Sequence, residues 1–126
     1  FFSHPVVNDI CDFIQLSLDP WDGEAFLRIY YKMGAGISKK AAMEAVDANT
    51  RRLTLLDTVA EMDEVSVYTR KQCKALATHL DNMRYESAGK AIYRILNYMG
   101  YQEFMDTHGL DSGKAEILKA LGEQPV

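Results

Sequence analysis

The sequence has little cysteine, proline or tryptophan and no excess of positive charge. Its 126 residues include two cysteines, three prolines and one tryptophan, and the formal net charge is -4. Two cysteines are too few for a disulfide-rich scaffold. An acidic balance argues against a broad surface for nucleic acid or for acidic lipid. These absences favour a protein of the cell interior, and we expect an intracellular, cytoplasmic location.

The sequence also lacks a long uncharged apolar run. The apolar N-terminal segment, Phe1–Leu18, is interrupted by His4, Asp9 and Asp12. A membrane span needs about 20 mainly apolar residues, so we expect no membrane insertion. Cys11 and Cys73 each lie within an apolar helical pattern, which predicts two buried, reduced thiols. A single disulfide between them is also compatible with the sequence.

Strand signals are missing, and helical periodicity replaces them. No sustained apolar–polar alternation occurs, whereas apolar residues recur at spacings of three and four along most of the chain. The pattern predicts an all-α fold, a single domain over residues 1–126. We expect a bundle of five to seven helices with one long central helix. The predicted segments are Val6–Leu18, Gly23–Met33, Ser38–Met62, Val67–Met83, Ala88–Met99, Tyr101–Thr107 and Asp111–Leu121.

The predicted central helix, Ser38–Met62, has a coiled-coil-like seam. Apolar residues and one Asn recur at alternating spacings of three and four, as helices that pack along their length require. Ser38 supplies an N-cap for this helix, as Asp22 and Ser66 do for two others. The seam consists of Val46, Asn49, Leu53, Leu56 and Ala60.

No motif for catalysis, metal or cofactor binding is present. The three histidines have no partner at metal-ligand spacing. Cys73 and His79 are six residues apart, which places them about 240° apart around a helix, so they cannot form a local nucleophile–base pair. We therefore expect a non-enzymatic protein without a cofactor. A site assembled in space from Cys73, His79 or His108 stays open.

Aromatic residues are too numerous to be all in the core. Tyrosine and tryptophan are enriched at protein interfaces, where they act as anchors. We therefore predict a surface for a protein partner, or for a second copy of the chain, at the two aromatic-rich parts of the sequence. The predicted protein-binding residues are Trp21, Tyr31, Tyr93, Tyr98, Tyr101 and Phe104.

A small group of basic residues offers an alternative function. Antiparallel packing of two helices brings these residues together as a site for nucleic acid. However, Ser38–Leu80 holds seven basic and six acidic residues, so a salt-bridged solvent face is favoured and nucleic acid is the second hypothesis. The residues of this alternative are Arg51, Arg52, Arg70, Lys71 and Lys74.

Three segments together resemble a known helical domain. They are Arg51-Arg52-Leu53-Thr54-Leu55-Leu56, the helix Lys71–Leu80, and Tyr85-Glu86-Ser87-Ala88. Their order and spacing are similar to the helical domain shared by the steroid receptor RNA activator protein and the C-terminal end of the outer-coat subunit of COPII vesicles. The chain departs from that family in the third helix, which lacks the usual His, and after Tyr101, where the expected Trp is absent. The resemblance implies a non-enzymatic bundle, an adaptor or scaffold module within a larger coat or regulatory protein.

Overall fold

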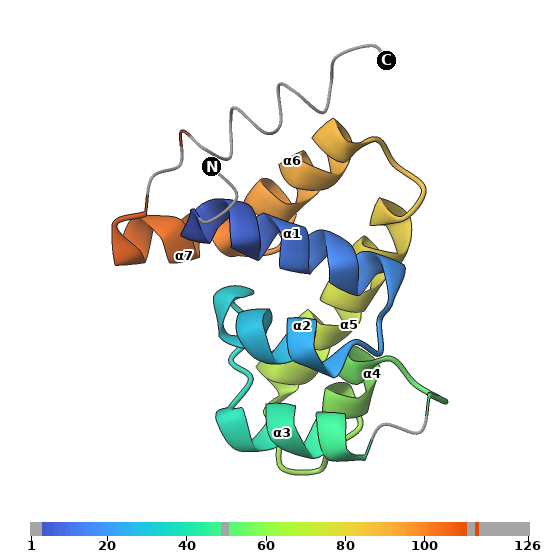
Figure 1. Ribbon diagram of the computed structural model, residues 1–126. Coiled ribbons are helices and arrows are strands. Elements are labelled where there is room, and N and C mark those ends of the chain that lie inside the picture. The colour runs from blue at the N-terminus through green and yellow to red at the C-terminus, as the bar shows by residue number, and fades with distance from the viewer. Residues whose placement is uncertain (1–3, 49–50, 111–112, 114–126) are drawn as a thin grey trace.

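The computed structural model describes residues 4–48, 51–110 and 113, and it is all-helical over those residues. The predicted bundle is confirmed, with seven α-helices and one short 3-10 helix (Figure 1). The predicted last helix, Asp111–Leu121, lies outside the described residues. The elements are α1 (Pro5–Leu18), α2 (Gly23–Ile29), η1 (Tyr30–Lys32), α3 (Lys39–Asp47), α4 (Leu55–Ala60), α5 (Val67–Met83), α6 (Ala88–Tyr98) and α7 (Tyr101–His108).

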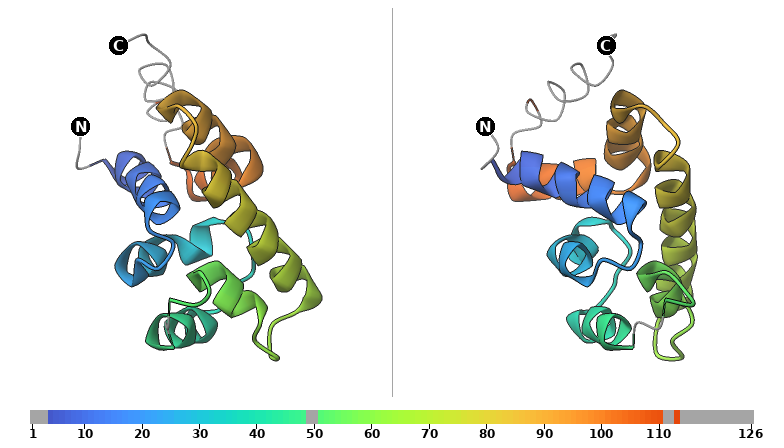
Figure 2. Two further views of the ribbon diagram at one scale, coloured as in Figure 1. Left: turned by 90° about the vertical axis from the view of Figure 1, so that its right-hand side faces the viewer. Right: turned by 45° about the vertical axis from the view of Figure 1, so that its right-hand side comes forward.

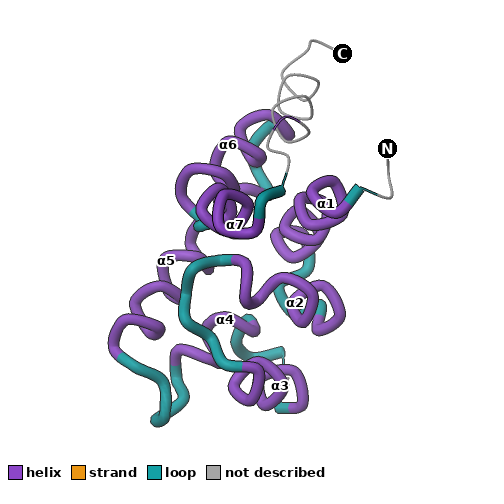
Figure 3. Tube along the Cα trace, turned by 90° about the vertical axis from the view of Figure 1, so that its left-hand side faces the viewer, coloured by secondary structure: helices purple, strands orange, loops and turns teal. Residues whose placement is uncertain are grey.

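The helices form two groups that α5 connects. Helices α1, α2 and α3 lie one below another, and α5 runs across this stack (Figure 2). At one end α6 and α7 gather beside α1, and at the other end α4 packs against α3 and α5 (Figure 3). One core cluster includes buried residues from all seven α-helices. None of the described helices combines the length and the apolar character needed to cross a bilayer.

Side-chain caps begin six of the seven described α-helices, and three of these caps are ones that the sequence predicts. Asp22 Oδ1 accepts a hydrogen bond from the Ala25 backbone N–H at 3.1 Å. Ser38 Oγ accepts one from Ala41 at 3.0 Å, and Ser66 Oγ accepts one from Thr69 at 3.1 Å. Each bond satisfies a backbone donor that has no partner within the first helical turn. The three predicted caps are therefore confirmed.

The predicted single helix Ser38–Met62 is wrong, because this segment forms two helices. Helix α3 ends at Asp47 and α4 begins at Leu55, where Thr54 Oγ1 accepts a hydrogen bond from the Asp57 backbone N–H at 3.1 Å. This cap starts a new helix in a new direction. Arg51 has a φ of +62°, and Leu53, predicted on the buried seam, is 41% exposed. The longest described helix is instead α5, with 17 residues.

Helix α1 has one solvent-facing stripe, and this corrects the prediction for Cys11. The exposed residues Asn8, Cys11, Gln15 and Leu18 follow helical spacing along it. Cys11 is therefore exposed, whereas Cys73 is buried as predicted, and both are free thiols. The apolar pattern of α1 is wide enough to include Cys11, but neighbouring helices cover only part of its circumference.

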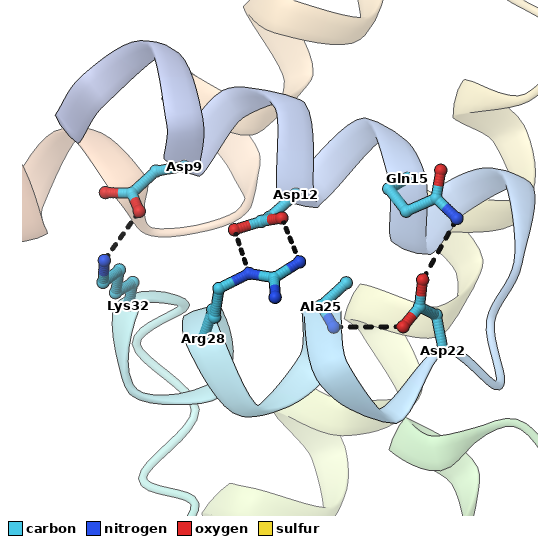
Figure 4. A network of polar contacts seen from close by, with 7 residues as sticks. All are labelled: Asp9, Asp12, Gln15, Asp22, Ala25, Arg28 and Lys32. Carbon is cyan, nitrogen blue, oxygen red and sulfur yellow. Dashed lines mark hydrogen bonds and ion pairs between the residues drawn. The ribbon is translucent and has the colours of Figure 1, made fainter. Parts of the chain in front are cut away.

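Polar contacts join α1 to α2 and η1 (Figure 4). Lys32 Nζ lies 2.6 Å from Asp9 Oδ1, and the Arg28 guanidinium binds both oxygens of Asp12 at 2.9 Å. The Asp12–Arg28 pair is open to solvent on its arginine side, whereas Asp9 is buried. A second donor completes the Asp9 site, because the hydroxyl of Tyr101 in α7 donates to Asp9 Oδ2 at 2.7 Å.

Gly100, which links α6 to α7, provides a test of this packing. Its φ is +79°, and an added Cβ would lie 2.6 Å from the Met33 carbonyl oxygen. Gly109, after α7, has a φ of +65°, but no described atom lies within 4 Å of its added Cβ. Gly109→Ala is expected to cost only the left-handed conformation, about 1 kcal/mol. Gly100→Ala should cost about 1–3 kcal/mol more in the free energy of unfolding, because the backbone must move. Equal losses in denaturant titrations would contradict this packing.

Candidate functional site

Two of the predicted tyrosines and a neighbouring histidine form an exposed surface across α5 and α6. Tyr98 stacks on His79 with ring centroids 5.7 Å apart, and Tyr93 meets Tyr98 edge-to-face at 5.9 Å. Tyr93 is 44% exposed and Tyr98 is 58% exposed. We call Tyr93, Tyr98 and His79 the Tyr98 surface. The structure thus brings together two of the predicted residues and adds a histidine that was not predicted to lie there.

Arg94 of α6 forms a charged pair with Glu86 and supports the His79 ring of the Tyr98 surface. Arg94 binds the Glu86 carboxylate with Nε and Nη2 at 2.9 and 3.1 Å, and its Nη1 lies 2.8 Å from His79 Nδ1. A guanidinium can only donate, so His79 Nδ1 accepts and the proton of the neutral ring is on Nε2. These contacts hold the imidazole under Tyr98. Glu86 lies in the turn before α6, outside the helix, so helical periodicity offered no signal for this pair.

A second aromatic surface lies between η1 and α7. Tyr31 and Phe104 meet edge-to-face at 6.1 Å, and Lys32 Nζ lies 5.3 and 5.5 Å from the two ring centroids. These rings border a shallow hollow of about 230 Å³ that also includes polar and charged side chains. Lys32 is directed to Asp9, so the rings cover an ion pair. This arrangement favours a structural contribution from Phe104 and leaves Tyr31 exposed.

Tyr101, which we predicted as a protein-binding residue, is fully buried, so its predicted place at the surface is wrong. It is 0% exposed, and its ring packs edge-to-face on Phe13 at 5.5 Å. Burial, together with its hydrogen bond to Asp9, raises the pKa of the Tyr101 hydroxyl above its usual range. A tyrosine in the core that donates to a carboxylate has no surface to offer a partner. The predicted cluster of Tyr93, Tyr98 and Tyr101 is therefore divided between the surface and the core.

Trp21 is half-buried in the turn between α1 and α2. Its indole Nε1–H donates to the Leu53 carbonyl at 3.0 Å, across 32 residues of sequence. The Arg51 guanidinium carbon lies 6.0 Å from the centre of the ring. The hydrogen bond fixes the indole against the segment before α4. Trp21 therefore lies near the α4–α5 side of the molecule, apart from the Tyr98 surface.

The predicted basic patch is only partly available at the surface. Arg70 Nε donates to the Ala60 carbonyl at 2.8 Å and Nη2 donates to the Met62 carbonyl at 3.1 Å. Arg70 thus caps the end of α4, which corrects its predicted place in the basic patch of the nucleic-acid alternative. The other four residues of the patch are exposed, namely Arg51, Arg52, Lys71 and Lys74. Lys74 lies in a shallow groove together with the carboxylates of Asp57 and Asp81, which offset its charge.

The residues considered for catalysis occupy three different environments. Cys73 is fully buried, and burial raises the pKa of its thiol to about 12, so it is not a thiolate at neutral pH. His79 belongs to the Tyr98 surface, and His108 stacks on Phe104 at 4.0 Å. They do not form one site. In the part of the chain that the structure describes, no three His, Cys, Asp or Glu side chains gather closely enough to hold a metal ion.

Comparisons with models of known protein families, with curated proteins and with solved structures find no match to this chain. The resemblance to the steroid receptor RNA activator and COPII outer-coat domain therefore stays a prediction. Any function has to be argued from the surfaces and contacts described above.

The His79 environment predicts the direction of its titration. Burial and the Arg94 cation lower the pKa of His79 below 6.5, while Glu86 opposes them. A lowered pKa means that the folded state prefers the neutral ring. The stability that this gives is present above about pH 6.5 and is lost as the pH falls through the folded-state pKa. In NMR titrations of the His79 ring, Arg94→Gln should raise this pKa and Glu86→Gln should lower it. An unchanged His79 pKa in both variants would contradict the observed contacts.

Proposed function

We propose that this chain is a non-enzymatic protein-interaction module, an adaptor or scaffold unit that binds a protein partner or a second copy of itself. The module acts within a larger coat or regulatory assembly, as the resemblance implies. The observation that carries this proposal is the Tyr98 surface, where two tyrosines project beside a histidine that is fixed by Arg94.

The Tyr98 surface has the chemistry of an interface anchor. Tyrosine offers a large apolar ring with a polar hydroxyl, and only two torsions have to be fixed on binding. Here Tyr98 already rests on His79, and Tyr93 rests on Tyr98. Part of the entropic cost of ordering these rings is therefore met during folding, which favours binding.

Two observations support a protein partner over nucleic acid. Arg70 is committed to the end of α4, and acidic groups lie beside Lys74. Nucleic-acid binding depends on several phosphate contacts from cations that are free to release counterions. Of the remaining exposed cations, Arg51 packs over the Trp21 ring, and Arg52, Lys71 and Lys74 form a weak basis for such a site.

An intracellular, cytoplasmic location is part of the same proposal. Cys11 is exposed and Cys73 is buried, and neither is in a disulfide. An exposed free thiol is compatible with a reducing compartment, where disulfides are rare.

The proposal predicts complex formation that depends on the Tyr98 surface. Sedimentation velocity and affinity capture from the source extract should show either self-association or one specific protein partner. The double substitution Tyr93→Ser and Tyr98→Ser should weaken that complex at least tenfold, about 1.4 kcal/mol or more, because it removes the aromatic anchors.

Tyr85→Ser is the matched control, because Tyr85 is 79% exposed and outside the Tyr98 surface, so it should leave the complex unchanged. A strictly monomeric chain that captures no protein would contradict the proposal. Affinity for nucleic acid that falls steeply between about 50 and about 200 mM salt would instead support the basic-residue alternative.

A further inference from the structure

We propose that a cavity beside Trp21 is a binding site for a single neutral aromatic ring. Residues of the turn after α1, of α4 and of the second half of α5 line the cavity. Figure 1 shows these elements. We call the cavity the Trp21 pocket, and its volume is about 180 Å³. This site is independent of the proposed protein interaction, because it requires no protein partner and none of the rings of the Tyr98 surface.

The floor and walls of the Trp21 pocket are apolar. Four leucines from three helices supply the floor, and each of them is at most 3% exposed. The indole of Trp21 forms one wall, so an aromatic guest has a ring to pack against. The apolar lining consists of Leu16, Pro20, Trp21, Leu55, Leu56, Ala77 and Leu80, and Thr54, Asp81 and Arg84 complete the border.

Four tertiary hydrogen bonds hold the border of the pocket in place. The Trp21 indole N–H donates to the Leu53 carbonyl at 3.0 Å, and the Leu55 backbone N–H donates to the Pro20 carbonyl at 3.2 Å. On the other side, Arg84 Nε and Nη2 both lie 3.4 Å from the Ser17 carbonyl. These bonds join three segments that are distant in sequence. The pocket is therefore formed before a ligand arrives, which is typical of small-molecule sites.

The size of the pocket selects the class of ligand. An engineered apolar cavity of about 150 Å³ in another protein stays dry and binds benzene. Sites for nucleotides or drug-sized molecules are typically about 300–1,000 Å³. At about 180 Å³, the Trp21 pocket accommodates one aromatic ring with a small substituent. Apolar burial supplies the affinity, because the lining carries few polar atoms.

Charges at the mouth favour a neutral ligand. Asp81 of α5 and Arg84, the C-cap residue directly after that helix, both line the pocket. Each is exposed, so their opposite charges are partly screened and offset each other at the opening. A small polar substituent of the ring, such as a hydroxyl or an indole N–H, is accommodated at this edge by hydrogen bonding to the carboxylate or to the guanidinium.

The test is an NMR titration of the full chain with toluene, phenol and indole. We expect saturable shift changes for the Trp21 indole N–H and for the methyl groups of Leu16, Leu55, Leu56 and Leu80. Intermolecular contacts from the probe protons to these methyl groups should be observed in the wild type. Failure of all three probes to bind saturably, or shift changes confined to the Tyr31 or Tyr98 rings, would overturn the proposal.

Two alanines of α5 provide a matched pair of variants. Ala77 lines the pocket, whereas Ala75 is exposed on the same helix and is absent from the lining. Ala77→Leu should fill the pocket and weaken binding of toluene at least tenfold, and Ala75→Leu should leave it unchanged. Equal affinity in both folded variants would overturn the proposal. If Ala77→Leu fails to fold, the intermolecular contacts in the wild type decide the location of the probe.

Charged analogues test the preference for a neutral ring. Phenylacetate and phenethylamine carry opposite charges on similar frames, so they report on Asp81 and Arg84 separately. We expect neither to bind more than threefold tighter than toluene. A tenfold preference for either ion would overturn the assignment of a neutral ligand.

Discussion

The packing of the bundle depends on one buried carboxylate. Asp9 of α1 is 5% exposed and receives the Lys32 ammonium at 2.6 Å and the Tyr101 hydroxyl at 2.7 Å. A buried carboxylate without donors would cost several kcal/mol, so both donors have to be in place when the core closes. Lys32 belongs to η1 and Tyr101 to α7, and thus a single side chain fixes both elements to α1. The more exposed Asp12–Arg28 pair has no comparable constraint.

This constraint determines which aromatic residues are left at the surface. Because Tyr101 is turned into the core to reach Asp9, α7 packs beneath α1, and Phe104, one turn later, lies over Lys32. Tyr93 and Tyr98 precede this turn on α6, and they remain at the surface beside His79 of α5. The Tyr98 surface and the Trp21 pocket are thus separate consequences of the same packing. The Tyr98 surface exposes aromatic rings, and the Trp21 pocket has space for an aromatic ring.

Local signals in the sequence predicted most of the helices and three of their caps, whereas contacts between distant parts of the chain could not be predicted. Asp22 and Ser38 bond to backbone groups three residues away, so their roles follow from the sequence alone. Thr54 gives the same kind of signal, with Asp57 three residues later, but the longer apolar periodicity favoured one continuous helix. Tyr101 and Arg70 have partners that no periodicity predicts, namely a carboxylate 92 residues away and the carbonyls at the end of another helix. For the candidate site, Tyr93 and Tyr98 could be predicted as surface residues, but their contact with His79 depends on how α5 and α6 meet.

The most direct test of this account is a double-mutant cycle that measures unfolding free energies for Asp9→Ala, Tyr101→Phe and the combined variant. In the wild-type background, Tyr101→Phe removes one donor from a buried carboxylate and should cost about 1.5–3 kcal/mol. After Asp9→Ala the tyrosine hydroxyl has lost this acceptor, so the same change should cost little, and the coupling should be at least about 1 kcal/mol. Equal costs of Tyr101→Phe in both backgrounds would contradict the claim that Asp9 organises the packing of α1, η1 and α7.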